Sequence, residues 1–318
     1  MKEFILTANE SGQRFDKYLK KLLPNAGSSF LYKMLRKKNI TLNGTKASGN
    51  EKLKEQDRVC LYFSDETFLK FSQDSEALQK EYEALQKLDD KKLPVVYEDE
   101  DILILNKPYN LLSQKAKPED VSANEYMLGY LIQRGTLTFE EFRTFRPSVC
   151  NRLDRNTTGL LIAGKSMTGL QEMSEMLRTR EVRKYYRCIV SGTIDKPASL
   201  KGYLIKDERT NKVRVVAQSK DDSVYIETAY TPVKQGDGWT LLEIHLITGR
   251  THQIRAHLSS IGHPIIGDMK YGDPVINKKY EKQYHVKYQL LHAYRLEFPN
   301  GKMVSVDPPH IFTKITEV

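Results

Sequence analysis

The sequence predicts an α+β protein, in which a large domain with a mixed, mainly antiparallel central sheet follows a small α/β domain. Extended runs dominate from Leu93 onward, and they lack the regular alternation with helices that a doubly wound sheet requires. Residues 1–62, by contrast, read as two short helices and a hairpin. A chain of 318 residues has room for two such domains, one of them with a substantial core.

We predict three consecutive parts: a small domain at 1–64, an acidic and partly helical linker at 65–92, and the large domain at 93–318. Residues 1–62 carry 13 Lys and Arg against 6 Asp and Glu, whereas the linker carries 5 against 8. The formal net charge of the chain is +9. So basic a unit attracts a polyanion, most often nucleic acid and less often an anionic membrane surface. A solvated basic surface without a partner is the alternative.

The small domain begins with a helix over residues 12–23, because its apolar residues fall on one stripe. A second helix follows Ser28 or Ser29, either of which can cap its N-terminus. Asn43-Gly44 stands between two short extended runs, which is a strong signal for a hairpin turn. Cations recur at helical spacing in the second helix and share one face, and they are Lys33, Arg36 and Lys37.

The linker has neither Pro nor Gly from 63 to 92, and its apolar residues lie at helical spacing, so we expect a helix there. A solvated spacer is the alternative. The large domain is expected to contain helices near 169–178 and 251–260 only. Its strands are rich in Ile, Val, Tyr and Leu, and they are ILILNKP, GLLIAGK, KYYRCIVSG, KVRVVAQ, VYIETAYTPVK and TLLEIHLITG.

Several classes of protein are disfavoured. No apolar stretch approaches the length of a membrane span, and the N-terminus MKEFILTANESGQRF does not resemble a signal peptide. Cys60, Cys150 and Cys188 are isolated, which argues against a disulfide framework and against a zinc site built on cysteines. We therefore expect a cytoplasmic protein.

Three segments carry candidate chemistry. The first places Asp154 between Arg152 and Arg155, in a loop rich in Asn and Thr whose side chains can bond to nearby backbone. Such a loop could present the carboxylate rigidly, although spacing alone favours an ordinary surface pair of Arg and Asp. The second segment is Lys184-Tyr185-Tyr186 at the start of a strand, where one tyrosine should face the core and the other the opposite side.

The third segment, Thr248 to Arg255, runs from a strand end into a helix. Ile254 and Leu258 can pack inward one turn apart, which leaves Arg255 free to turn toward a cleft. A metal site is not expected, because no H-E-x-x-H motif or nearby acidic ligand accompanies the three histidines His245, His252 and His257. The run from Glu98 to Asp101 is expected to be a charged turn, not a set of nuclease carboxylates.

In order and wording, these segments resemble the RluA family of pseudouridine synthases. NRLDRNTTGLL resembles the family's H-R-L-D-x-x-T-S-G-L-L, and Thr248 to Arg255 is identical to its T-G-R-T-H-Q-I-R. The family's K-x-Y resembles Lys184 to Tyr186, and the likeness extends over about residues 93–312. Asn151 replaces the usual His and Thr158 the usual Ser, at positions that do not supply the catalytic carboxylate.

The resemblance implies a pseudouridine synthase fold with Asp154 as its essential carboxylate, which either attacks the sugar or base or removes a ribose proton. Arg255 would pair with this acid. Tyr186 would stack on the target base and could help to remove the proton from the new carbon linkage. The isomerisation involves no redox change, so no cofactor is expected.

Residues 12–62 are similar to the RNA-binding domain first named from ribosomal small-subunit protein four. The resemblance implies a structured RNA substrate, expected to be large-subunit (23S) ribosomal RNA, and we expect the enzyme to be a monomer. Arg152 would fill the space left by a flipped-out uridine. Arg250 would also bind RNA, and the basic face of the second helix would contact phosphates.

Two other functions fit part of the pattern. A catalytically silent RNA-binding or ribosome-assembly factor could share this scaffold, but it should have lost at least one of Asp154, Tyr186 and Arg255. A hydrolase of glycosidic bonds would be expected to show paired carboxylates, and only one acid here has a convincing setting.

Overall fold

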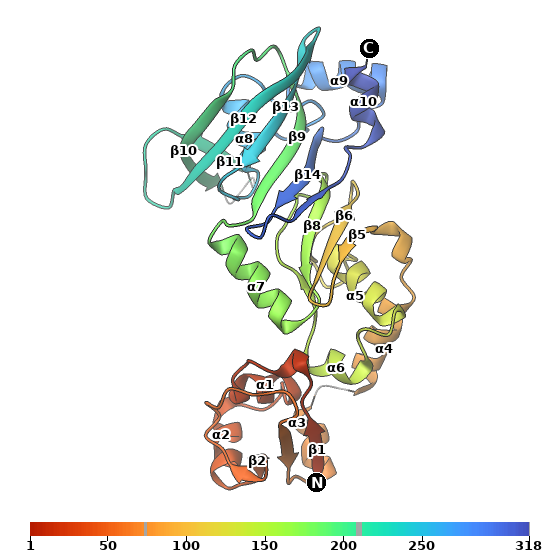
Figure 1. Cartoon of the computed structure of the whole chain (residues 1–318), viewed down its shortest axis with the longest axis vertical. Helices are drawn as coiled ribbons and strands as arrows, with labels where there is room; N and C mark the ends of the chain where they lie inside the picture. Colours follow the sequence, from red (N-terminus) through yellow and green to blue (C-terminus); the bar gives the residue numbers. More distant parts are fainter. Residues whose placement is uncertain (73–74, 208–211, 318) are drawn as a thin grey trace.

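Two separate β-sheets organise the chain, a small one near the N-terminus and a large one at the opposite end of an elongated molecule (Figure 1). The computed structural model describes residues 1–72, 75–207 and 212–317, so residues 73–74 of the predicted linker and Val318 lie outside this description. Within these ranges no helix is both long and apolar enough to cross a bilayer.

The small sheet confirms the elements that were predicted for residues 1–62. Its four strands pair in the order β1-β4-β2-β3, and Asn43 and Gly44 form the turn between β2 and β3 with φ angles of 51° and 72°. Two helices pack their apolar stripes against it, with Phe15 and Leu31 among the buried side chains. The elements are β1 Lys2–Ile5, η1 Ala8–Glu10, α1 Phe15–Leu22, α2 Ser28–Arg36, β2 Ile40–Leu42, β3 Thr45–Lys46 and β4 Arg58–Leu61.

The predicted linker is helical, as expected, and its two helices join different cores. In α3 (Asp65–Phe71), Phe68 is buried with the small sheet. In α4 (Ser75–Gln86), Leu78 and Leu85 are buried in the main core of the larger part. The packed alternative therefore holds, and the segment is not a solvated spacer.

The large sheet is mixed and mainly antiparallel, as predicted. Among the described residues its strands follow the order β11-β10-β12-β13-β9-β14-β8-β6-β5, and of these neighbours only β14 and β8 run parallel. The strands are β5 Val95–Glu98, β6 Ile102–Lys107, β7 Ser148–Val149, β8 Thr158–Gly164, β9 Arg183–Ser191, β10 Ala198–Asp207, β11 Lys212–Val216, β12 Val224–Gly236, β13 Trp239–Leu246, β14 Leu291–Glu297 and β15 Met303–Ser305. The run from Glu98 to Asp101 forms the expected turn between β5 and β6.

The prediction that this part has only two helices was wrong. The two expected helices are present, but so are α5, α6, α9 and α10. Most of α5 is buried, so its apolar residues surround the axis and leave no amphipathic stripe to recognise. Helix α9 is largely polar, and its signal lay in its cap, where Asp273 precedes Pro274. The helices are α5 Ala123–Gln133, α6 Phe139–Thr144, α7 Met167–Arg178, α8 Gln253–Ser260, α9 Pro274–Tyr284 and α10 His310–Thr316, and the short 3₁₀ helix η2 Asp90–Lys92 lies at the end of the predicted linker.

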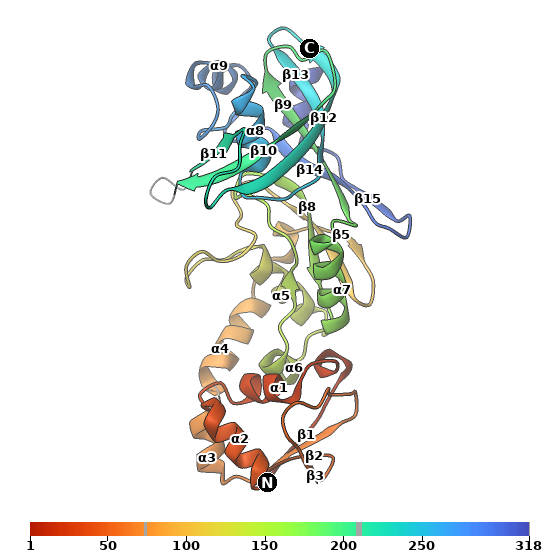
Figure 2. The same ribbon diagram turned by 90° about the vertical axis from the view of Figure 1, so that its left-hand side faces the viewer.

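Alternate residues of β6 and β8 point to opposite faces of the sheet and belong to different cores. Leu103 and Leu161 lie in the main core with residues of α5, whereas Ile104 and Leu160 lie in a second core with Met173 of α7. Period-two alternation in a central strand therefore builds a layer on each side. Figure 2 shows α5 and α7 on either side of these strands.

Strand β14 follows α9 in the chain and lies between β9 and β8, where it joins the two halves of the large sheet. It approaches β8 closely at Gly159, whose φ of 106° is one that other residues rarely adopt. A Cβ atom built on this glycine would lie 2.2 Å from the carbonyl oxygen of Ala293. Only glycine fits at this junction.

We expect Gly159→Ala to lower the free energy of unfolding by about 3 kcal/mol or more, because it combines a disfavoured backbone angle with a clash against main chain. Thermal unfolding of the purified variant measures the loss. Gly27→Ala is the matched control, since its φ is −63° and a Cβ there meets nothing within 4 Å. Equal unfolding temperatures for the two variants would contradict the expectation.

The small sheet and the large part meet at α1 and α6. The Glu10 carboxylate accepts a hydrogen bond from the Thr144 hydroxyl at a buried position, and Asn9 donates to Glu141 at 3.3 Å. These polar contacts join η1, the short helix before α1, to α6. The basic helix α2 lies at the far end of the molecule from α8 (Figures 1 and 2).

Candidate active site

One guanidinium group links two carboxylates at the centre of the site. Arg255, from the first turn of α8, donates from Nη1 to Oδ2 of Asp154 at 2.7 Å. Its other edge meets Asp268, with Nε to Oδ2 at 2.7 Å and Nη2 to Oδ1 at 2.9 Å. The side chain of Asp154 is 25% exposed, against 8% for Arg255 and 0% for Asp268. Of these three linked side chains, Asp154 is therefore the one that a substrate can reach.

Both buried partners are held in their charged forms. Burial alone would lower the pKa of the Arg255 guanidinium, but Asp268 and then Asp154 raise it above its usual value. Burial alone would raise the pKa of Asp268, and the hydrogen bond and charge of Arg255 lower it instead. Charge-assisted hydrogen bonds of this kind keep the two groups aligned.

The loop that carries Asp154 is clamped from both sides by buried side chains. The hydroxyl of Ser113 donates to the carbonyl oxygen of Leu153 and accepts from its N–H, each at 2.9 Å. On the other side, Lys107 Nζ donates to the carbonyl oxygen of Arg155 at 3.0 Å. The residues before and after Asp154 are thus fixed, as expected of a loop that presents a carboxylate rigidly.

Lys107 also ties this loop to the one that follows β6. Its Nζ donates to the carbonyl oxygens of Pro108 at 3.0 Å and Leu111 at 2.8 Å, and the residue is fully buried. Burial lowers the pKa of Lys107 to about 7, while the charge of Asp154 acts to raise it. Three carbonyl acceptors favour the protonated form, because an ammonium group can donate to all three.

The two positions at which the sequence departs from the RluA pattern both support the same loop. The Asn151 side chain accepts a hydrogen bond from the N–H of Ile162 at 2.8 Å. The hydroxyl of Thr158 shares a hydrogen bond of 2.7 Å with Nδ1 of the buried His292. Asn and Thr therefore anchor the loop to β8 and β14 in this chain.

Gln253 sets the direction in which Arg255 leaves the chain. Its amide oxygen accepts from the Thr248 hydroxyl at 2.9 Å and from the N–H of Arg250 at 3.1 Å. Its amide nitrogen donates to the carbonyl oxygen of Glu227 at 3.0 Å and to Thr228 at 2.9 Å. These bonds fix the passage from β13 into α8, and Ile254 and Leu258 pack into the core as predicted.

Of the two tyrosines in β9, Tyr186 faces the core and Tyr185 faces away, which confirms the expected alternation. Tyr185 stacks on His245 with ring centroids 4.8 Å apart. Burial raises the pKa of the Tyr186 hydroxyl well above its usual value, and the Asp154 charge raises it further. A tyrosine that stays protonated is suited to stacking and to donating a hydrogen bond, and poorly suited to removing a proton.

The other two histidines considered above also have individual partners. His252 caps α8 in a left-handed conformation, and its Nδ1 lies 3.0 Å from the hydroxyl of Tyr271. His257 shares a hydrogen bond with Thr228, and burial lowers its pKa to about 4, so it is neutral. Across the described residues, no three His, Cys, Asp or Glu side chains gather as a metal site.

The predicted RNA-binding residues are exposed but are not gathered in one place. Arg152 lies two residues before Asp154, and Arg250 lies in the passage into α8, five residues before Arg255. Lys33 and Arg36 lie on α2 and Lys37 directly after it, and α2 lies far from α8, the helix that carries Arg255 (Figure 1).

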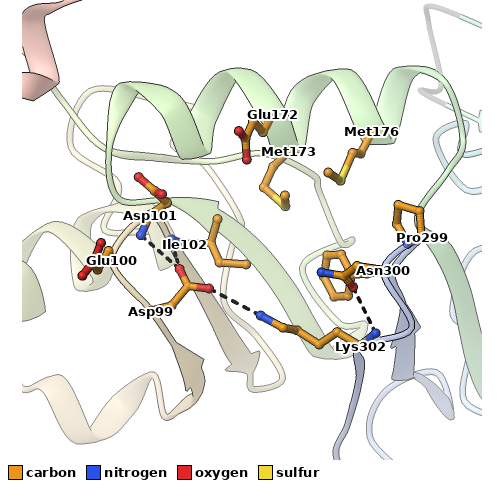
Figure 3. Close-up of a pocket in the computed structure, with 11 residues that line it drawn as sticks. Asp99, Glu100, Asp101, Ile102, Glu172, Met173, Met176, Pro299, Asn300 and Lys302 are labelled. Atoms are coloured by element: carbon orange, nitrogen blue, oxygen red, sulfur yellow. Dashed lines mark hydrogen bonds and ion pairs between the residues drawn. The ribbon is translucent and has the colours of Figure 1, made fainter.

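A cavity of about 350 Å³ between α7 and the turns of β5–β6 and β14–β15 is not this site (Figure 3). Its carboxylates serve the fold, because Asp99 accepts from the N–H groups of Asp101 and Ile102, at 3.0 and 2.9 Å. Asp101 in turn accepts from Ser166, the N-cap of α7. Asp154, Tyr186 and Arg255 do not line it.

Three supporting residues had not been identified as part of the site: Lys107, Ser113 and Asp268. Lys107 and Asp268 lie within residues 93–312, over which the likeness to the family extends, and this was the only signal for them. Ser113 lies in a loop with no motif, and its two bonds are to backbone, so no sequence signal marked it.

Comparisons with known proteins identify the family. A family model described as RNA pseudouridylate synthase matches residues 101–260. An uncharacterised RNA pseudouridine synthase of Mycoplasma genitalium is 31% identical over 93% of this chain and 89% of its own. Ribosomal large subunit pseudouridine synthase C of Vibrio cholerae is 30% identical over 91% of this chain and 85% of its own, and that of Escherichia coli is 29% identical over 96% and 91%.

A solved structure supports the fold. Human RNA Pseudouridylate Synthase Domain Containing 4 matches with a TM-score of 0.55 and 22% identity, covering 75% of this chain and 95% of that one. The matched family segment includes Lys107, Asp154, Tyr186 and Arg255, which the fold brings into one region. The chain belongs to the RNA pseudouridylate synthase family, and it is an enzyme that isomerises uridine in RNA to pseudouridine.

Proposed function

We propose that Asp154 is the catalytic carboxylate, and the observation that carries this proposal is its 2.7 Å pair with Arg255. The ion pair fixes one oxygen of the acid, which leaves the other for the substrate. Asp154 either attacks the sugar or base or removes a ribose proton. Tyr186 stacks on the target base through the face of its ring.

We propose ribosomal RNA of the large subunit as the substrate. Several relatives that match this chain over most of its length are named ribosomal large subunit pseudouridine synthase C. The target uridine must leave its stack to reach Asp154, at a cost of a few kcal/mol. Arg152 is exposed next to the acid and fills the space that the base leaves.

We further propose that residues 1–64 form an RNA-binding domain, joined by residues 65–92 to a catalytic domain at 93–318. The exposed cations of α2 support this proposal, because they lie together on one surface of a basic unit. Arg250 adds an RNA contact beside the catalytic pair. The long separation between α2 and α8 suits a structured RNA that spans both parts. We propose a cytoplasmic monomer that uses no cofactor.

Substituting Lys33, Arg36 and Lys37 together by Gln should flatten the salt dependence of RNA binding. Each phosphate contact contributes about 0.7 to 0.9 to the slope of log affinity against log salt, so the slope should fall by about 2 to 3. Binding of a ribosomal RNA fragment at several salt concentrations measures it. The matched control replaces Lys87, Lys91 and Lys92, three exposed lysines of the acidic linker. An unchanged slope in the α2 variant would remove α2 from the RNA contact.

Pseudouridine mapping of cellular RNA with and without this protein tests the substrate. We expect one or a few sites in large-subunit ribosomal RNA to lose the modification when the protein is absent. The purified enzyme should restore these sites in RNA from the deficient cells without releasing uracil. Loss of pseudouridine only from other RNAs would overturn the assignment to ribosomal RNA. Unchanged maps together with RNA binding would favour a catalytically silent factor.

A further inference from the structure

The strongest unassigned feature of the site is the side of Arg255 that faces away from Asp154. The carboxylate of Asp268 is fully buried and takes two parallel hydrogen bonds from the guanidinium. It also accepts from the N–H groups of Lys270 at 2.8 Å and Tyr271 at 3.0 Å. Backbone N–H groups of its own turn therefore hold the Asp268 carboxylate in place independently of Arg255.

The turn that carries Asp268 is in turn fixed to α9. Asn277 donates from its amide nitrogen to the carbonyl oxygen of Asp268 at 3.0 Å and accepts from the N–H of Gly267 at 2.7 Å. The ring of Tyr271 lies 5.1 Å from the guanidinium carbon of Arg255 and contributes a cation–π contact. The plane of Arg255 is therefore defined by groups outside the Asp154 loop.

A substrate that is a polyanion makes this arrangement necessary. Phosphate binds guanidinium in the same bidentate geometry as carboxylate, so RNA entering the site competes with Asp154 for Arg255. A side chain held only by Asp154 could turn toward the RNA backbone and leave the acid misplaced. Two bonds to a carboxylate that no substrate can reach prevent that turn.

We propose that Asp268 is a positioning residue that holds Arg255 on Asp154 while RNA is bound. The proposal rests on the proposed role of Asp154. It assigns to Asp268 no contact with RNA and no share in substrate affinity. Its effect reaches the reaction only through the guanidinium group.

The test is Asp268→Asn, which keeps the size of the side chain and an oxygen that can accept the backbone bonds. Its NH₂ group would face an N–H of Arg255, and two donors cannot bond, so the fork is lost. We expect the single-turnover rate to fall about 10²-fold, as for other small misplacements of reacting groups. The dissociation constant for the RNA substrate should change less than about twofold, because no phosphate contact is removed.

A double-mutant cycle with Arg255→Met separates positioning from general structural support. If Asp268 acts only through Arg255, Asp268→Asn has almost no further effect on the rate in the Arg255→Met background. Effects that multiply would overturn the proposal. Asp273→Asn is the matched control, since this nearby acid caps α9 and does not touch Arg255, and its rate should equal that of wild type.

Three further outcomes would each refute one of the two proposals. If Asp268→Asn does not fold, Arg255→Lys replaces it, because a lysine cannot present two edges at once, and near wild-type turnover by that variant would overturn the proposal. Wild-type turnover by Asp268→Asn, with an inactive Asp154→Asn, would refute the positioning role alone. Turnover by Asp154→Asn would instead refute the proposed function.

Discussion

Asp154→Asn should abolish pseudouridine formation while RNA affinity stays close to that of wild type. Asn keeps the shape of the side chain but loses the negative charge and the nucleophilic or basic oxygen, so we expect the rate to fall at least about 10⁴-fold. RNA affinity depends mainly on phosphate contacts, and Asp154 makes none of them. Single-turnover formation of pseudouridine in the RNA measures the rate, and equilibrium binding measures the affinity.

Asp120→Asn provides the control for this experiment. Asp120 is another acid close to the loop, its charge acts on Arg155, and it accepts hydrogen bonds from the N–H groups of Ala116 and Lys117. Removing it changes the local charge by the same amount without touching Arg255. The control should keep the wild-type rate, and a substantial rate for Asp154→Asn would exclude Asp154 from catalysis.

Lys107→Met should reduce both stability and activity. Methionine fills a similar volume but donates no hydrogen bonds, so the carbonyl groups of Pro108, Leu111 and Arg155 lose a shared donor. Unpaired polar groups cost about 1 to 3 kcal/mol each, and removal of a buried ammonium offsets part of this, so we expect a net loss of about 3 kcal/mol. The loop then moves, and turnover should fall about 10²-fold even below the unfolding temperature.

The comparison with Lys165→Met makes this prediction specific to the site. Lys165 Nζ also donates to a backbone carbonyl, that of Asp99, and to the Glu98 carboxylate, each at 2.7 Å. Its loss should lower the unfolding temperature of the enzyme and leave turnover unchanged, because it supports the β5–β6 turn. Thermal unfolding and turnover of both variants give the answer. Full turnover by Lys107→Met would show that the hydrogen bonds of Lys107 are not needed to position Asp154.

Much of the fold follows from local pattern. The apolar strands, the Asn43-Gly44 turn and the helices α1, α2 and α7 all have short-range signals that tertiary contacts only reinforce. The missed helices show the limit of this reasoning. A helix buried on most sides, such as α5, has no polar face to give it a period, so it can be recognised only once its neighbours are known.

The site shows a different limit. Spacing alone suggested that Asp154 pairs with an adjacent arginine, whereas its guanidinium partner comes from Arg255, far along the chain. Only the likeness to a known family pointed to that pair. The supports of the loop escape sequence reasoning because Lys107 and Ser113 bond to carbonyl and N–H groups, which every residue possesses. Backbone partners leave no mark in a sequence.

The position of β14 affects the order in which this enzyme can fold during its synthesis. Asp154 lies in the loop before β8, and Arg255 lies in the helix after β13. Strands β8 and β13 belong to opposite halves of the large sheet, and β14, which comes later in the chain, joins the two halves. A chain leaves the ribosome N-terminus first, so both residues emerge before the strand that brings their halves together. The small sheet closes at β4 and can form early. The pair of Asp154 and Arg255 can therefore assemble only after β14, which ends at Glu297, has been made, whereas the small sheet is able to fold well before the site is complete.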